Sequence, residues 1–87
     1  MKHTASSRFW RCYDDLPADV RELADKNFSL LKMDLTHPSL RFKLLSGRKL
    51  YSVRVCLHYR ALGLATEDGV HWFWIGTHAD YDRLVDQ

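Results

Sequence analysis

The segment of residues 51–58 alternates apolar and polar side chains, and it constrains the fold more than any other part of the chain. The apolar and the polar positions follow one another without a break: Tyr51, Val53, Val55 and Leu57 alternate with Ser52, Arg54, Cys56 and His58. A period of two predicts a strand with one face on a core and the other toward water. The water-facing side of this strand is therefore predicted to be basic.

Further strands are predicted on both sides of this segment. Residues 61–65 are apolar, residues 70–76 are rich in branched and aromatic side chains, and a turn-forming Asp68-Gly69 lies between the two segments. Residues 41–45 read as the preceding strand, followed by a turn at residues 46–49. Residues 2–5 carry only a weak strand signal. We expect Trp72 and Trp74 to share one sheet face and to pack in the core.

The N-terminal part predicts two helices. Ser6 and Ser7 can cap a helix that extends to Leu16, and Pro17 breaks it and suits the first turn of the next helix. The second helix is expected to end at Met33 or Leu35. The predicted fold class is α+β: one domain over residues 1–87, with a helical hairpin packed on one face of a roughly four-stranded antiparallel sheet.

Composition excludes several classes of protein. The chain has 87 residues, 46% of them hydrophobic, which suits a single globular domain. No segment has the apolar length of a membrane span or a secretory signal, so we expect a cytoplasmic protein. Cys12 and Cys56 are expected to be reduced and half-buried. The histidines lack metal-ligand spacing, so neither a metal nor another cofactor is expected.

Charge is distributed unevenly along the chain. Residues 35–66 contain six basic side chains and no acidic one: Arg41, Lys43, Arg48, Lys49, Arg54 and Arg60. Residues 67–87 contain Arg83 against five acids. Such a basic stretch suggests a surface that faces a polyanion. The alternative is that these charges only keep edge strands soluble.

Candidate functional residues lie in the basic stretch and just after the last strand. A hairpin that brings Arg54 and Arg60 onto one face would form a paired guanidinium site for phosphate, which Lys43 could join. Of the five histidines, His78 is the best placed for proton transfer, because it directly follows the last strand. Tyr81 lies three residues further on, and it could stack on a base, exchange a proton or close the end of a core.

The other histidines suit structural positions. His3 is expected in a frayed terminus and His37 in a turn, while His58 and His71 are expected on the surface. Asp80 and Asp82 give only a weak indication of paired-carboxylate chemistry.

The chain resembles the RelE/ParE superfamily of bacterial toxins from type II toxin–antitoxin modules. The resemblance covers nearly the whole chain and depends on five short segments: residues 15–17, 37–45, 51–55, 59–62 and 74–82. It implies a partner antitoxin and one of two activities. RelE-type members cut mRNA, usually in the ribosomal decoding site, whereas ParE-type members poison DNA gyrase.

The resemblance also implies roles for individual residues. Arg60 matches the arginine of the Tyr-Arg strand in the RNases and is expected, with Arg54, to stabilise the phosphate transition state. His78 is expected to be the base or acid, with Tyr81 orienting the RNA base or assisting proton transfer. The remaining RNA contacts are assigned to four residues of the basic stretch: Arg41, Lys43, Lys49 and His58.

The leading hypothesis is a ribosome-dependent endoribonuclease, and its partners would be a cognate antitoxin, the ribosome and mRNA. The alternatives are a non-enzymatic inhibitor of DNA gyrase and an inactive RNA-binding relative.

Overall fold

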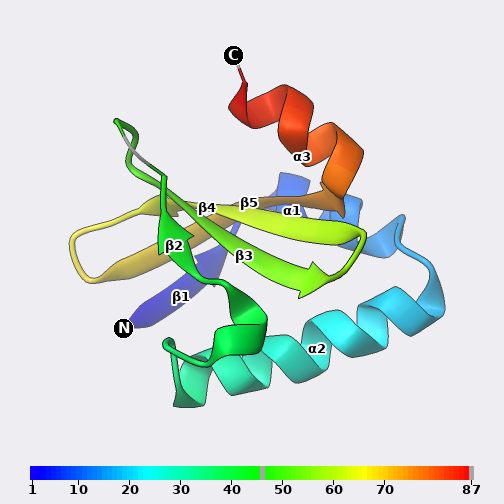
Figure 1. Ribbon diagram of the computed structural model, residues 1–87, viewed down its shortest axis with the longest axis horizontal. Coiled ribbons are helices and arrows are strands. Elements are labelled where there is room, and N and C mark those ends of the chain that lie inside the picture. The colour runs from blue at the N-terminus through cyan, green and yellow to red at the C-terminus, as the bar shows by residue number, and fades with distance from the viewer. Residues whose placement is uncertain (46, 87) are drawn as a thin grey trace.

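The computed structural model describes residues 1–45 and 47–86 as three α-helices and a five-stranded sheet. The strands are β1 (Lys2–Ala5), β2 (Lys43–Leu44), β3 (Leu50–Cys56), β4 (Tyr59–Ala65) and β5 (Gly69–Thr77). They lie in the order β1-β5-β4-β3-β2, and the helices flank the sheet (Figure 1). The α+β class is confirmed, with one strand more than expected.

The two edge strands differ from the sequence prediction. β1 pairs with β5 in parallel, so the sheet is mixed. His3 therefore lies in a strand rather than in a frayed terminus. The predicted strand over residues 41–45 contracts to β2, because Arg41 has φ +47° and follows a short 3-10 helix, η1 (Pro38–Leu40). Of the predicted turn at residues 46–49, Ser46 lies outside the described residues.

Helices α1 (Ser7–Asp14) and α2 (Ala18–Met33) form the expected hairpin. The Ser6 hydroxyl accepts a hydrogen bond from the Phe9 amide and caps α1. Pro17 precedes α2 and separates it from α1. The predicted boundaries are therefore accurate to within about one turn.

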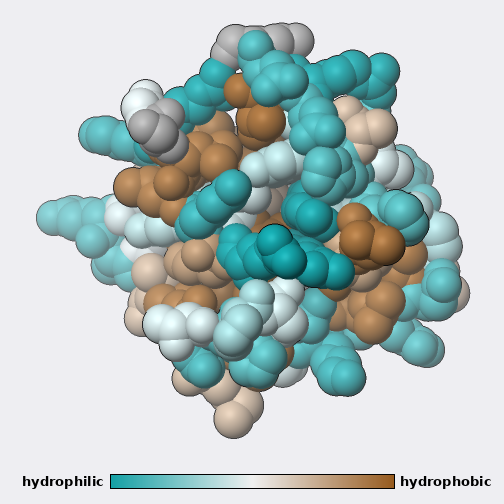
Figure 2. Space-filling view, viewed as in Figure 1, coloured by the Kyte–Doolittle hydropathy of each residue, from teal (hydrophilic) through white to brown (hydrophobic). Residues whose placement is uncertain are grey.

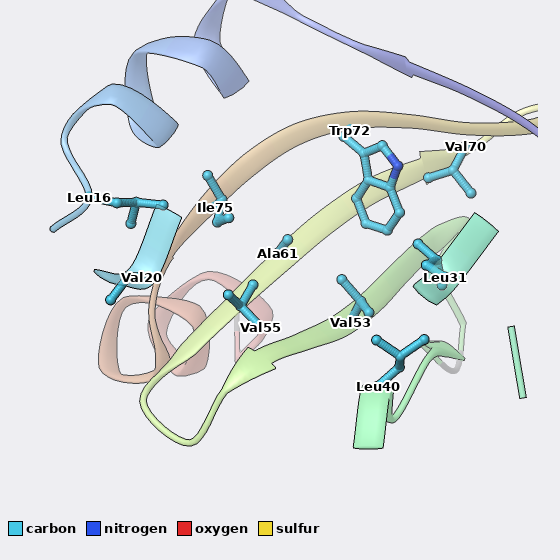
Figure 3. Packing of buried hydrophobic residues seen from close by; sticks show 10 residues of the cluster. All are labelled: Leu16, Val20, Leu31, Leu40, Val53, Val55, Ala61, Val70, Trp72 and Ile75. Atoms are coloured by element: carbon cyan, nitrogen blue, oxygen red, sulfur yellow. The ribbon is translucent and has the colours of Figure 1, made fainter. Parts of the chain in front are cut away.

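The main core lies between α2 and one face of the sheet (Figure 3). Its buried members come from the α1–α2 connection, α2, η1 and three strands: Leu16, Val20, Leu31, Leu40, Val53, Val55, Ala61, Val70, Trp72 and Ile75. Leu40 is 0% exposed and Leu31 2%. The alternation in β3 thus correctly placed Val53 and Val55 in the core. Leu57, in contrast, is exposed in the β3–β4 turn.

A third helix, α3 (His78–Val85), covers part of the opposite face of the sheet (Figure 1). Leu62 and Trp74 of the sheet form a second buried cluster with Tyr81 of α3. The prediction that both tryptophans share one face is wrong, because β5 has a bulge at Phe73: Leu62 pairs with Trp74 and Gly63 with Trp72. The extra residue sends Trp72 to the main core and Trp74 to the α3 side.

Candidate nucleic-acid interface

Arg54 and Arg60 are directly opposite each other on neighbouring antiparallel strands. Side chains at paired positions project from the same face, and Arg54 shares its face with Ser52 two residues earlier. Ser52 contacts α3 through Tyr81, so both arginines lie on the α3 side of the sheet. The hairpin predicted to bring the two guanidinium groups together is therefore present.

Arg60 is anchored to its own hairpin. Its Nη1 donates hydrogen bonds to the carbonyl oxygens of Cys56 at 2.6 Å and Tyr59 at 2.9 Å. Burial lowers the pKa of Arg60, and the positive charge of Arg54 lowers it further. An arginine remains protonated at neutral pH despite such a decrease. The anchored Arg60 is therefore a fixed positive charge, with Nε and Nη2 as its other donors.

Two more cations lie near this pair. The charge of Arg41 also lowers the pKa of Arg60, which places it in the electrostatic neighbourhood. Lys43 on β2 is opposite Ser52 and extends the basic surface to the sheet edge. Within residues 1–45 and 47–86, no ion pair involves any of these four cations. A band of hydrophilic side chains crosses the middle of the molecule in the view of Figure 2.

His78 begins α3 at the end of the sheet where β3 turns into β4. Its backbone amide donates to the carbonyl oxygen of His58 at 2.7 Å. Its Nδ1 lies 3.1 Å from a carboxylate oxygen of Asp82, one helical turn later. When Nδ1–H donates to a carboxylate, Nε2 is left with a free lone pair. His78 is partly exposed, with 42% of its side chain accessible, so this nitrogen can act as a proton acceptor.

Tyr81 is held in the fold by a buried hydrogen bond. The Ser52 hydroxyl donates to its phenolic oxygen at 2.9 Å, and Tyr81 is only 8% exposed. Of the alternatives raised by the sequence, closing the end of a core describes Tyr81 best, since stacking on an RNA base needs an exposed ring. The rings of Tyr81 and His78 are 5.8 Å apart between centroids.

Lys49 and His58, two predicted RNA-binding residues, lie at opposite ends of β3. Lys49 precedes β3, and the five residue steps from it to Arg54 span about 17 Å of extended chain. His58 is exposed in the β3–β4 turn, where Arg60 Nη1 bonds to the carbonyl oxygens of Cys56 and Leu57. The carbonyl oxygen of His58 accepts the hydrogen bond from the His78 amide.

The sequence did not predict the burial of Ser52 or the contact of Asp82 with His78. Ser52 has the alternation of a water-facing residue, yet it is 3% exposed because α3 covers it. A recognisable helix after β5 would have been the signal, since Thr77 caps α3 by accepting from the Asp80 amide. The spacing of His78 and Asp82 at i,i+4 would then have predicted their contact.

Two cavities of the described part of the chain have no lining residue among His78, Tyr81 and Arg60. One, of about 270 Å³, lies between α1, α2 and the sheet, is largely apolar and is bordered by Arg54. The other, of about 260 Å³, is lined by the α1–α2 connection, the end of β5 and Asp80 of α3. Neither of these two cavities joins both arginines to His78.

Three further findings concern metal ions, membrane spans and the cysteines. Among residues 1–45 and 47–86, no group of three or more histidine, cysteine, aspartate or glutamate side chains could hold a metal ion. No helix in those residues combines the length and apolar character that a membrane span requires. Cys12 and Cys56 are both free and half-buried, as expected.

Solved structures share this fold at low sequence identity. The toxin–antitoxin complex RelB–RelE from Methanococcus jannaschii contains a chain that matches with a TM-score of 0.73 and 15% identity, covering 92% of this chain and 96% of that one. A YoeB/ParE toxin from Agrobacterium tumefaciens matches with a TM-score of 0.69 and 16% identity, covering 90% and 99%. A copper-bound mutant toxin from Helicobacter pylori matches with a TM-score of 0.65 and 16% identity, covering 92% and 97%.

Comparison with curated proteins found no match. Comparison with known families matched residues 18–83 to the ParE-like toxin domain. This match includes α2, β2 to β5 and most of α3, and thus every candidate site residue named above. The chain therefore belongs to the ParE-like toxin domain family, within the RelE/ParE superfamily of toxins.

Proposed function

We propose that this toxin is an endoribonuclease that cleaves mRNA on the ribosome and thereby inhibits translation. The observation that carries the proposal is the cross-strand pair of Arg54 and Arg60, which lies on the face covered by α3 and has no carboxylate partner among residues 1–45 and 47–86. His78 begins that helix and is paired with Asp82. Unneutralised guanidinium groups close to a proton-transfer group are what phosphodiester cleavage requires.

The proposed reaction is attack of an RNA 2′-hydroxyl on the adjacent phosphorus. A base removes the 2′-hydroxyl proton, the new O–P bond forms, and the bond to the 5′-oxygen breaks as that oxygen receives a proton. The products are a 2′,3′-cyclic phosphate and a 5′-hydroxyl. Negative charge accumulates on the non-bridging oxygens during the attack, and fixed positive donors stabilise it.

In this scheme Arg54 and Arg60 bind the non-bridging oxygens, and Arg41 and Lys43 bind neighbouring phosphates. Lys49 and His58 would contact RNA further from the scissile bond. His78 Nε2 is the proton acceptor, or in its protonated form the donor, and Asp82 keeps it in the required tautomer. Tyr81, whose hydroxyl is engaged with Ser52, assists from beneath His78 rather than by stacking.

Neither of the two cavities described above joins both arginines to His78, and this supports ribosome dependence. A site that does not enclose its substrate cannot by itself hold a flexible message in the in-line geometry that 2′-hydroxyl attack requires. A ribosome that fixes the codon would supply this geometry. The same observation favours a second function, non-enzymatic inhibition of DNA gyrase, because a binding surface needs no cleft. The ParE-like description of the matched family also favours it.

The proposed partner for regulation is a cognate antitoxin. The RelB–RelE neighbour is an antitoxin–toxin complex, and its toxin fold resembles this chain over nearly its full length. The unpaired cations of β2, β3 and β4 would attract an acidic segment of such a protein.

Primer extension on a defined message in a cell-free translation reaction tests this function. Arg54→Ala is the sharpest variant, because among the described residues no hydrogen bond engages the side chain of Arg54, whereas the side chain of Arg60 also holds its hairpin together. Removal of one transition-state contact should slow cleavage by about 10² to 10³-fold. Arg8→Ala on α1 is the matched control, since it removes the same charge from an exposed position outside the interface.

Ribosome-dependent cuts by the wild-type chain and by Arg8→Ala, with little cutting by Arg54→Ala, would support the nuclease. An intact message in the presence of folded wild-type protein would reject it. A gyrase supercoiling assay on the same preparations would then distinguish a gyrase inhibitor from an RNA-binding relative.

A further inference from the structure

Ser52 is the one fully buried polar side chain among residues 1–45 and 47–86. It lies in the middle of β3, two residues before Arg54 and opposite Lys43. Its hydroxyl donates a hydrogen bond to the phenolic oxygen of Tyr81 at 2.9 Å. The bond joins the central strand of the basic surface directly to α3.

The rest of α3 follows directly from β5 and packs on the sheet through apolar side chains. Leu84 and Val85 pack against the apolar cluster of Leu62, Trp74 and Tyr81. Apolar packing contributes stability but little direction. A neutral hydrogen bond between two buried groups contributes less energy than apolar packing, but it fixes the orientation of the two groups, because its donor and acceptor must be aligned.

The position of α3 decides where His78 lies. His78 is the first residue of α3, and its ring contacts the Tyr81 ring at a centroid distance of 5.8 Å. Its other fixed contacts are the amide bond to His58 in the β3–β4 turn and the carboxylate of Asp82. A shift of Tyr81 over the sheet would therefore move the imidazole relative to Arg54 and Arg60.

We propose that Ser52 is a positioning residue: its hydrogen bond to Tyr81 sets α3 in register on the sheet and so holds His78 beside the arginine pair. Ser52 and Tyr81 act through His78 and do not touch RNA. This inference rests on the proposed nuclease function for its catalytic consequence, but the placement of His78 by Ser52 is a property of the folded chain alone.

The first test is kinetic and uses cleavage of ribosome-bound message. Ser52→Ala should lower the maximal cleavage rate about tenfold and leave the toxin concentration at half-maximal rate unchanged. Tyr81→Phe should have a similar effect, and the double variant should be no slower than either single variant, since all three lack the same bond. Ser52→Thr retains the hydroxyl and should restore most of the rate.

A merely structural role would give a different pattern. If Ser52 acts through His78, then Ser52→Ala should cause no further loss in a His78→Ala background. An additional tenfold loss there would overturn the proposal, as would a Ser52→Ala rate equal to that of the wild type.

The second test needs no activity and therefore separates this inference from the proposed function. Nuclear Overhauser contacts between the His78 and Tyr81 rings should be present in the wild type and in Ser52→Thr, and weaker or absent in Ser52→Ala. The His78 ring signals should also shift in that variant. Unchanged ring contacts and shifts in folded Ser52→Ala would overturn the positioning role even if the wild type cleaves RNA.

Discussion

The two faces of the sheet are built from the same strands but differ in what covers them. On one face α2 and the end of α1 cover an apolar layer that includes Val53, Val55 and Trp72. On the other face α3 covers Leu62 and Trp74, and Lys43, Arg54 and Arg60 lie on the same side of the sheet. One strand therefore contributes to the core and to the interface through alternate residues.

This difference indicates a division of labour within β3. The buried members of the closed face are all apolar and should determine stability. The open face carries Lys43, Arg54 and Arg60 on neighbouring strands, and among the described residues no ion pair neutralises them. Burial is the main cause of the lowered pKa of Arg60, and the charge of Arg54 lowers it further, so this arrangement costs stability. A surface kept in this state is better explained by a ligand than by folding. Substitutions on the two faces should therefore have separable effects.

The largest effect is expected from emptying the closed face. Leu40→Ala should lower the free energy of unfolding by about 2 to 5 kcal/mol, because Leu40 is 0% exposed and truncation leaves a cavity. Urea unfolding measures this loss. Leu44→Ala is the control, since Leu44 is 55% exposed and should change stability by less than about 0.5 kcal/mol. Equal losses in the two variants would contradict the assignment of the core.

A smaller effect is expected from overfilling the same face. A Cβ on Gly63 would lie 2.2 Å from Val70 Cγ1 and 2.8 Å from Trp72 Cε3. Gly63→Ala should therefore destabilise the protein by about 1 to 3 kcal/mol as these side chains shift. Thermal unfolding and the near-ultraviolet signal of the tryptophans report this change. Wild-type stability in this variant would mean that Trp72 packs elsewhere.

On the open face, the arginines should affect RNA binding rather than folding. Each phosphate contact that is lost should reduce the salt dependence of single-stranded RNA affinity by about 0.7 in the log–log slope. We expect this decrease for Arg54→Ala and for Arg41→Ala, measured by fluorescence anisotropy between low and physiological salt. Lys26→Ala on α2 should leave the slope unchanged, and a decrease of equal size there would indicate non-specific attraction.

The smallest effect concerns pH and the N-terminal strand. Trp72 Nε1 donates to His3 Nδ1 at 3.1 Å, which requires an unprotonated Nδ1. Partial burial, the N-terminal amine and Lys32 lower the pKa of His3. The unfolded chain therefore binds this proton at a higher pH than the folded chain. Stability should decrease as the pH falls below about 6.5, the ordinary pKa of histidine, toward the lower folded value.

A comparison of urea unfolding at pH 7.5 and pH 5 for the wild type and for His3→Gln isolates this contribution. The variant should lose less stability than the wild type over that range. A larger loss in the variant would contradict the sign of the His3 shift.

Much of the closed face could be predicted from the sequence, because it depends on local patterns. The alternation of residues 51–56 correctly placed Val53 and Val55, and Pro17 correctly separated the helices. On the open face, the sequence indicated that a hairpin would bring Arg54 and Arg60 onto one face, and the two residues are paired. In these cases the period of the pattern and the chemistry of one turn were sufficient.

The open face was less predictable, because its geometry depends on contacts between distant segments. Ser52 reads as a surface residue until α3 is known to cover it. The bulge at Phe73 reverses the face of Trp74, and no local signal marks it. The parallel edge strand β1 is specified by its pairing with β5, which is 67 residues away. Tertiary contacts decide such features, and periodicity does not contain them.

The central claim is that adjacent residues of one strand serve folding and function separately. Val53→Ala and Arg54→Ala test it directly when urea unfolding and ribosome-dependent cleavage are measured on both. Val53→Ala should lose about 1.5 to 3 kcal/mol of stability and retain its cleavage rate per folded molecule. Arg54→Ala should retain its stability and lose about 10² to 10³-fold in cleavage rate. Parallel losses of stability and activity in both variants would contradict the account.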